Sequence, residues 1–234
     1  MLIREAPQSG VLVLRLDRPG RLNALSLELA RQLLQAVQDA QRDPAVRAIL
    51  LAGEGRAFCA GKDRDDPAGP EFVEVLQQLA LALMQGAKPV VAQVQGWAVG
   101  AGVELLLNCD IVIAASNARF MLPEVHAGLF GTGGVLALLP RKIGLARAKG
   151  ALMLGQEFSA AQALDWGLIW SVVDDTRLAD EALAIARQLA ASDPAILASI
   201  KSQLHREAVG DLAAVMQREA EVHRQLPFQL TSGR

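Results

Sequence analysis

The chain has 234 residues, of which 52% are hydrophobic and 21% are charged, and its formal net charge is −2 at pH 7. This balance indicates a globular protein with a full core, because disordered chains are poorer in hydrophobic residues and carry a larger net charge. It gives no electrostatic reason for the chain to bind nucleic acid or an anionic membrane surface. No apolar run approaches the roughly 18 residues that cross a bilayer, and the N-terminus lacks the pattern of a signal peptide, so we expect a cytoplasmic protein.

The first part of the chain alternates between strand patterns and helix patterns, with turn-forming residues between them. Ser26 is a favourable N-cap for the first helix, whose apolar residues recur at helical spacing. The repeated strand–helix–strand order predicts an α/β fold with a mostly parallel sheet. The expected elements are strands at 2–6, 11–16, 46–52, 89–95, 111–115 and 119–122, and helices at 27–43 and 71–86.

From Pro140 onward the sequence pattern is mostly helical. A change in composition near residue 175 divides the chain into an α/β core at 1–175, which carries the expected site, and a helical C-terminal subdomain at 176–234. Alanines at helical spacing suit close helix packing, so we expect this subdomain to take part in oligomerisation. The expected helices lie near 145–154, 160–166, 178–191, 194–207 and 211–224, with a strand-like break at 168–173.

The stretch 96–110 combines a glycine-rich turn with the start of a short apolar helix. The first N–H groups of a helix have no intrahelical partner and lie at its positive end, so this turn can bind negative charge. Glu104 follows on the same side of the first helical turn as Ala101, which places a carboxylate beside those donors. A purely structural role is about equally common, because the helix dipole favours acids in the first turn. The stretch also lacks the third glycine of a dinucleotide-binding fingerprint.

Two further features have ordinary structural explanations. The segment 61–63 is similar to the end of a phosphate-binding loop, but Arg56 and Asp63 stand where that loop needs glycine and a hydroxyl residue. We therefore exclude a nucleotide-hydrolysing site. Glu124 directly follows Pro123, and this pair is common at the start of a helix.

The cysteines and histidines do not indicate a metal site. Cys59 and Cys109 have no metal-type spacing and are expected to be small buried apolar residues. His126, His205 and His223 are widely separated in the sequence, and only His126 lies close to the expected site.

Several segments occur in a fixed order along the chain, and none of them is specific alone. They are 21–26 (RLNALS), 55–63 (GRAFCAGKD), 96–110, 122–125 (LPEV), 155–160 and 167–173. Together they resemble the enoyl-CoA hydratase/isomerase family over residues 10–205. The resemblance implies the crotonase fold, a spiral of ββα units in α/β layers with a helical C-terminal subdomain. It also implies a homotrimer or a hexamer.

The resemblance implies an acyl-CoA thioester substrate, in which coenzyme A is part of the substrate, and no separate cofactor or metal. In the family, two backbone N–H groups hold the thioester oxygen, and the corresponding positions are Lys62 and Ala101. Nucleic acid and membranes are not expected as partners. The positions that correspond to family contacts with substrate or coenzyme A are Arg21, Leu22, Ala24, Ala60, Gly61, Asp63 and Gly100.

Glu104 and Glu124 have the spacing of the two acids of the family's hydratases. The expected reaction is reversible addition of water to a trans-2-enoyl-CoA, giving a 3-hydroxyacyl-CoA. By family analogy Glu124 protonates C2 of the substrate and Glu104 holds the water. The alternatives are a 2,3-enoyl-CoA isomerase, which needs one acid, and another acyl-CoA enzyme of the same fold, such as a decarboxylase or hydrolase. A silent or RNA-binding subunit is a further alternative, which the mild net charge and the acid pair disfavour.

The sequence departs from the family pattern at three places, and the first of them leaves the preferred acyl chain length open. The loop 63–71, which helps to wall the acyl pocket in the family, is shorter than usual. Phe130 stands where proline is common. The chain ends soon after Phe228, where relatives usually continue for about another helix.

Overall fold

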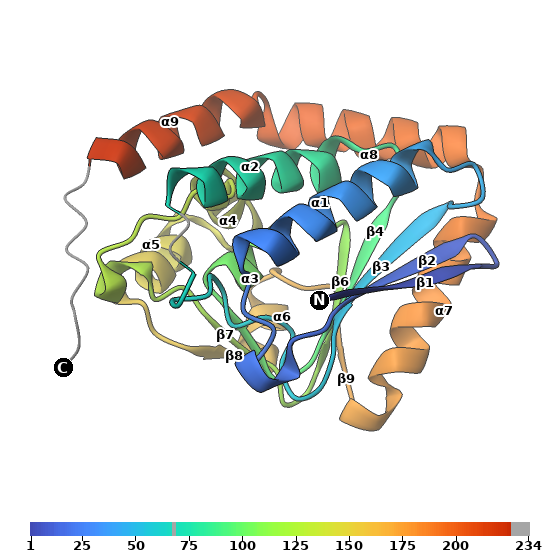
Figure 1. Cartoon of the computed structure of the whole chain (residues 1–234), viewed down its shortest axis with the longest axis horizontal. Helices are drawn as coiled ribbons and strands as arrows, with labels where there is room; N and C mark the ends of the chain where they lie inside the picture. The colour runs from blue at the N-terminus through green and yellow to red at the C-terminus, as the bar shows by residue number, and fades with distance from the viewer. Residues whose placement is uncertain (67–68, 226–234) are drawn as a thin grey trace.

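The main sheet of the computed structural model has six strands in the part of the chain that is described, residues 1–66 and 69–225 (Figure 1). The strand order is β1-β2-β3-β4-β6-β9, and every neighbouring pair except β1–β2 is parallel. The predicted mostly parallel sheet is therefore confirmed. The strands are β1 (Leu2–Gln8), β2 (Val11–Leu16), β3 (Ala48–Gly53), β4 (Val90–Val94), β6 (Ile111–Ala115) and β9 (Ser171–Val173).

Helices cover both faces of this sheet (Figure 1). On one face α1 (Leu27–Arg42) and α2 (Pro70–Gln85) share a core with Leu51, and on the other face α7 (Leu178–Ala191) packs with Leu50. Successive residues of a strand point to opposite faces, so neighbouring leucines of β3 enter different cores. Cover on both faces explains why β3 is a continuous buried apolar run without alternation.

The first helix begins where the sequence predicts. The hydroxyl oxygen of Ser26 accepts a hydrogen bond from Leu29 N at 3.2 Å, which is the expected N-cap. Leu29, Leu33 and Val37 follow one another at helical spacing and are buried against the sheet. Helical periodicity and a capping residue were therefore sufficient to place this element.

A second, three-stranded sheet is formed by β5 (Trp97–Val99), β7 (Arg119–Met121) and β8 (Phe158–Ser159). β5 and β8 were not predicted, because segments of three and two residues show no readable periodicity and form only through their partners. Ala98 of β5 also pairs with Cys59 in an isolated bridge. This pairing draws the glycine-rich segment after β3 alongside the turn that follows β5.

The helices predicted in the C-terminal part are present, with ends within two residues of the predicted ones. α8 and α9 pack against α2 and α4 (Figure 1). None of the helices in the two described ranges is both long and apolar enough to cross a bilayer. In this part of the chain the α-helices besides α7 are α4 (Val135–Ile143), α5 (Leu145–Leu154), α6 (Ala160–Asp165), α8 (Pro194–Val209) and α9 (Leu212–Gln225).

The predicted boundary at residue 175 falls just before α7, which shares a hydrophobic core with the main sheet. Farther along, the buried ammonium of Lys201 lies 2.7 Å from the carboxylate of Asp110 and donates to the carbonyl oxygen of Leu83. Residues beyond 175 are therefore tied closely to the core. A separate oligomerisation subdomain at 176–234 stays a prediction, and its last residues, 226–234, lie outside the described part of the chain.

Candidate active site

The turn after β5 brings two backbone segments into direct contact. α3 (Ala101–Leu107) begins at this turn, and all of its residues are buried. A Cβ atom placed on Gly102 would lie 2.3 Å from the carbonyl oxygen of Cys59, closer than side chains allow. Glycine is therefore required here, and the segment that leads to Lys62 packs directly against the first turn of α3.

The backbone N–H groups of Lys62 and Ala101 lie at this contact. A Cβ atom on Gly61, whose φ is 88°, would lie 2.7 Å from Val99 O and 3.6 Å from Ala101 N. Leu25 forms hydrogen bonds with the residues on either side of Lys62, so the Lys62 N–H faces the opposite side. Within the described ranges neither amide donates to a backbone carbonyl. An available donor at the N-terminus of α3 and a second one beside it can stabilise negative charge that develops on a ligand.

Glu104 projects from α3 into a buried site and is only 3% exposed. Its Oε1 accepts hydrogen bonds from the backbone N–H groups of Thr132, at 2.9 Å, and Gly133, at 3.2 Å. Burial, followed by the charges of Glu124 and Glu219, raises the pKa of Glu104 to about 8, although the two N–H donors act in the opposite direction. The pKa of this carboxyl group is therefore close enough to neutral pH for the group to exchange a proton with a ligand.

Glu124 opens the short 3-10 helix η2 (Glu124–Ala127), directly after Pro123. Its Oε1 lies 2.8 Å from the position of a Cβ atom built on Gly100, so the side chain reaches the turn in front of α3. Burial raises the pKa of Glu124, and its Oε2 is buried and accepts no hydrogen bond from the described residues. Buried carboxylate oxygens rarely lack a donor, so Oε2 is available to water or to a bound substrate.

Sequence reasoning missed the segment that holds Glu104. Residues 131–134 were recognisable as a glycine-rich turn, but the pattern did not indicate that their N–H groups bind a carboxyl group. The side chain of Gln77 donates to Thr132 O at 2.9 Å, and that of Asn108 donates to Gly133 O at 3.0 Å. The donors for Glu104 are therefore fixed from two sides.

Sequence reasoning also missed Glu219, an acid of α9 that is 2% exposed. Burial raises the pKa of Glu219 to about 7. A signal was present in the sequence, because Glu219 follows Leu212 and Met216 at helical spacing and so stands on the apolar face of its helix. An acid in that position needs a buried partner, which only the folded chain reveals.

The residues expected to contact coenzyme A lie in two segments that the fold brings together. Ala60 N donates to Leu22 O at 2.9 Å, which joins the segment 21–26 to the segment 55–63. Arg21 is exposed and pairs with Asp65, so its guanidinium stands at the surface. The roles of these residues toward coenzyme A remain predictions.

The side chains of Asp63 and Lys62 have structural tasks. Asp63 is 7% exposed, and its hydrogen bond with Arg18, at 2.7 Å, holds the pKa of Asp63 below its usual range. The ammonium of Lys62 donates to Asp66 O at 2.8 Å. Both side chains therefore help to hold the loop in place.

The cysteines and His126 are occupied by packing and by local hydrogen bonds. Cys59 and Cys109 are buried, and burial raises the pKa of each thiol to about 12, so both act as small apolar residues. His126 Nε2 lies 2.9 Å from Leu154 O at the end of α5. In residues 1–66 and 69–225, no three His, Cys, Asp or Glu side chains are grouped so that they could hold a metal ion.

Replacing Glu104 by glutamine is expected to change the pH dependence of stability. The folded state binds the Glu104 proton more tightly than the unfolded state, so the stability contributed by this group is present below about pH 4.5 and is lost as the pH rises to about 8. Glutamine keeps an acceptor for the two N–H donors but cannot ionise. Compared with the wild type, Glu104→Gln is expected to have a higher free energy of unfolding at pH 9 than at pH 5. We expect the difference between the two pH values to be on the order of 3 kcal/mol.

Thermal unfolding followed by circular dichroism at both pH values measures this difference. Glu74→Gln, which changes an exposed acid of α2, is the matched control and should show no such difference. A Glu104→Gln effect that is the same at pH 5 and pH 9 would contradict the raised pKa.

The sequence matches the family model for enoyl-CoA hydratase/isomerase over residues 6–232. Similar proteins include 1,2-epoxyphenylacetyl-CoA isomerase of Escherichia coli (strain K12), 40% identical over 93% of this chain and 87% of that protein. A probable enoyl-CoA hydratase of Rhodobacter capsulatus is 36% identical over 96% of this chain and 89% of that protein. A crystal structure of an enoyl-CoA hydratase from Mycobacterium avium subsp. paratuberculosis K-10 has a TM-score of 0.91 at 30% identity, covering 100% of this chain and 94% of that one. The predicted crotonase fold is confirmed, and the chain belongs to the enoyl-CoA hydratase/isomerase family, whose members act on acyl-CoA thioesters.

Proposed function

We propose that this protein is an enoyl-CoA hydratase, which adds water reversibly to a trans-2-enoyl-CoA and gives a 3-hydroxyacyl-CoA. The observation that carries the proposal is a pair of acids, the buried Glu104 and the half-buried Glu124, each with a raised pKa and near enough for the charge of Glu124 to act on Glu104. Hydration needs one group to hold water and another to protonate carbon. Relatives named as hydratases support the same assignment.

In this proposal the thioester oxygen accepts hydrogen bonds from the backbone N–H groups of Lys62 and Ala101. Attack of water at C3 moves negative charge onto that oxygen, next to the positive end of α3. Donors that meet charge where it forms are effective because they need no reorganisation, and the loss of one typically costs about 2.7–4 kcal/mol. The site therefore favours the enolate-like state over the bound ground state.

The acid pair completes the proton balance. Burial and mutual repulsion disfavour double ionisation, and in this proposal the two carboxyl groups share one proton. Water forms the bond to C3 and gives a proton to one carboxylate, while C2 receives a proton from the other carboxyl group. The pair holds one proton before and after the addition, which makes the step reversible. We propose that Glu124 protonates C2, because its Oε2 has no donor in the described ranges, and that Glu104 holds the water.

A second candidate function is isomerisation of an acyl-CoA, which rearranges bonds within the substrate and adds no water. It is favoured by the 40% identity to a protein named 1,2-epoxyphenylacetyl-CoA isomerase. The two candidates differ in the mass of the product, since only hydration adds a water molecule. Product analysis with several acyl-CoA substrates also separates hydration from decarboxylation or thioester hydrolysis.

Turnover of crotonyl-CoA and of longer trans-2-enoyl-CoA thioesters tests the proposed reaction. We expect hydration by the wild-type protein, and a loss of about 10²–10⁴-fold in kcat for Glu104→Gln and for Glu124→Gln, because each removes a positioned proton-transfer group. The decrease in enoyl absorbance and the product mass provide the measurement. Glu74→Gln is the matched control. Full hydration by Glu104→Gln would refute the two-acid mechanism, and an isomerised product without added water would favour the second candidate.

The next prediction concerns the contact at Gly102. The methyl group of Gly102→Ala would overlap the carbonyl oxygen of Cys59, so the segment before Lys62 must move away from α3. We expect at least about a hundredfold loss of kcat/KM, because displacement of one oxyanion donor has an effect of that size. Gly150→Ala, in α5, is the control, since a Cβ atom there meets nothing within 4 Å. Equal activity of the two variants would show that the contact does not position the donors.

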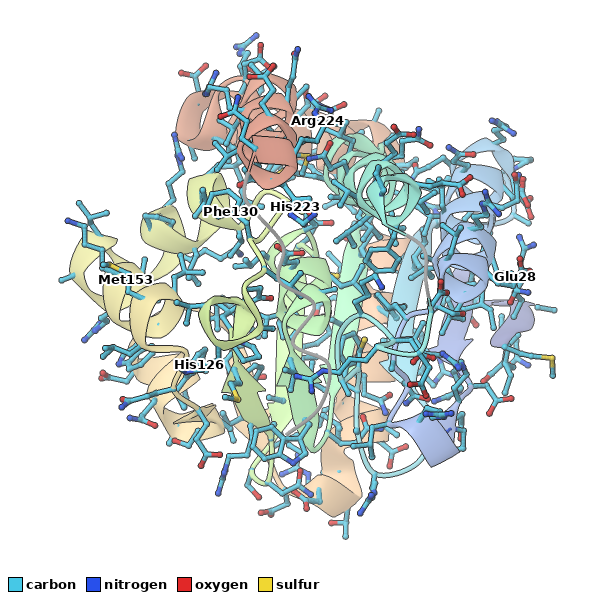
Figure 2. All side chains as sticks on the ribbon, turned by 60° about the vertical axis from the view of Figure 1, so that its left-hand side comes forward. Glu28, His126, Phe130, Met153, His223 and Arg224 are labelled. Carbon is cyan, nitrogen blue, oxygen red and sulfur yellow. The ribbon has the colours of Figure 1, made fainter. Side chains whose placement is uncertain are left out.

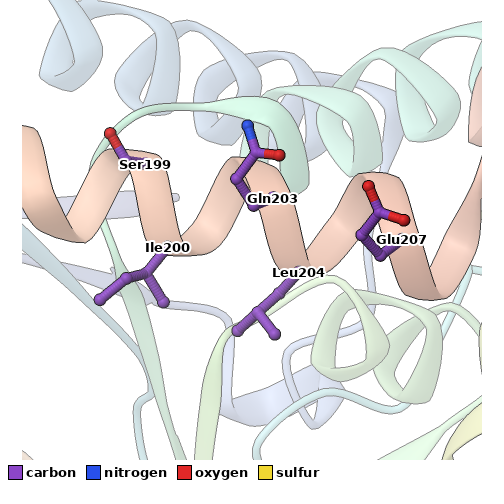
Figure 3. A pocket seen from close by; sticks show the side chains of 5 residues that line it. All are labelled: Ser199, Ile200, Gln203, Leu204 and Glu207. Atoms are coloured by element: carbon purple, nitrogen blue, oxygen red, sulfur yellow. The ribbon is translucent and has the colours of Figure 1, made fainter.

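We also propose a homotrimer or a hexamer. On α8, the side chains of Ile196, Ile200 and Leu204 are 60%, 50% and 62% exposed and recur at helical spacing. Ile200 and Leu204 point to the same side of α8 (Figure 3). A contiguous exposed apolar stripe of this kind is typical of a contact surface. Light scattering is expected to give three or six times the mass of the chain, and a mass equal to one chain would contradict the proposal.

A further inference from the structure

Glu219 is a buried acid outside the reaction described above, and it binds the start of α4. Its Oε2 accepts a hydrogen bond from Gly134 N at 2.9 Å, and its Oε1 accepts one from Leu136 N at 3.0 Å. The side chain comes from α9, more than 80 residues farther along the chain. Each oxygen therefore accepts a hydrogen bond from a backbone donor of the same helix terminus.

α4 needs this carboxylate because its own sequence supplies no cap. The N-cap residue is Gly134, which has no side chain to accept a hydrogen bond. The first N–H groups of a helix lack intrahelical partners, and a buried N–H without a partner destabilises the fold. Glu219 provides the missing acceptor and places negative charge at the positive end of α4.

The same helix terminus continues directly into the donors that hold Glu104. Thr132 N and Gly133 N, which bind the Glu104 carboxyl group, immediately precede the residue that Glu219 binds. The side chain of Gln77 donates both to Thr132 O, at 2.9 Å, and to Met216 O of α9, at 2.7 Å. α9 is therefore connected to the Glu104 donors by two independent routes.

Packing and electrostatics act at the same place. A Cβ atom on Gly134 would lie 2.8 Å from the methyl group of Met216, so α9 lies directly against the start of α4. His223 of α9, one turn after Glu219, forms a hydrogen bond with the backbone of Phe130. Figure 2 shows these two residues next to each other, on the lower side of α9. After burial and the charge of Glu124, the charge of Glu219 is a further cause of the raised pKa of Glu104.

We propose that Glu219 is a positioning residue, which holds the N-terminus of α4 so that the backbone N–H groups of residues 132 and 133 keep the carboxyl group of Glu104 in its reactive place. The inference rests on the proposed function for the role of Glu104. The ionisable groups near this arrangement are Glu104 on α3, Glu124 on η2 and His223 on α9. Glu219 touches no reacting atom and acts only through these contacts.

Two substitutions distinguish the effect of the Glu219 charge from the effect of the length of its side chain. Glu219→Gln removes the charge and leaves one acceptor oxygen for two N–H donors. Glu219→Asp keeps the charge, but the side chain is one methylene shorter and cannot bind both donors as the wild type does. Glu221→Gln, which changes an exposed acid of the same helix, is the control.

The experiment combines steady-state kinetics with titration of the Glu104 carboxyl group by carbon-13 NMR, using Glu104→Gln to identify its signal. For Glu219→Gln we expect kcat to fall about tenfold or more with KM within about twofold, because small displacements of a catalytic group have large effects on rate. We also expect the Glu104 titration to move to lower pH, because a like charge is lost. For Glu219→Asp we expect a similar fall in kcat while the Glu104 titration stays near that of the wild type.

Wild-type kcat in Glu219→Gln together with an unmoved Glu104 titration would overturn the proposal. If Glu219→Gln does not fold, Glu219→Asp tests the positioning role, because wild-type kcat in Glu219→Asp would also overturn the proposal. The NMR titration needs no turnover, whereas the product of the wild-type protein tests the hydratase assignment. Failure of the positioning role and failure of the proposed function are therefore distinguishable.

Discussion

The close approach of two backbone segments at Gly102 is the constraint on which the rest of the site depends. One segment follows β3 and carries Lys62, and the other follows β5 and begins α3. They meet where a Cβ atom on Gly102 would lie 2.3 Å from Cys59 O, so the contact exists only because this residue has no side chain. Donors from two separate parts of the chain can then serve a single ligand atom, as the proposed oxyanion hole requires.

The acids of the site are removed from water, although ionised carboxyl groups are more stable in water. Burial raises the pKa of Glu104 to about 8 and that of Glu219 to about 7, and it also raises the pKa of Glu124. Each raised pKa means that folding disfavours the ionised form, so these groups reduce the stability of the folded state at high pH. Such an arrangement is typical of a site tuned for proton transfer rather than for stability.

Backbone donors make this burial possible. Glu104 binds the N–H groups of residues 132 and 133, and Glu219 binds those at the start of α4. Two carboxyl groups from different helices therefore share one short glycine-rich segment, and Gln77 joins that segment to α9. α9 is thus part of the support of Glu104, although it is far from Glu104 in the sequence.

The sequence by itself determined most of the longer elements and the two acids of the proposed site. Periodicity and capping gave the helices, the continuous apolar run gave buried strands such as β3, and the order of the motifs indicated the family that the comparisons confirm. The pair of Glu104 and Glu124 was also visible, because their spacing is a property of the chain. These features follow from local interactions, which a linear pattern records.

Only the tertiary structure decided which groups meet. The short strands β5 and β8 form through pairing with distant segments, so no local sequence pattern predicts them. The bond between residues 132–133 and Glu104, and the cap that Glu219 gives to α4, join residues that are far apart in the chain. Such contacts depend on how helices pack against the sheet, and a buried hydrogen bond leaves no periodic trace in the sequence.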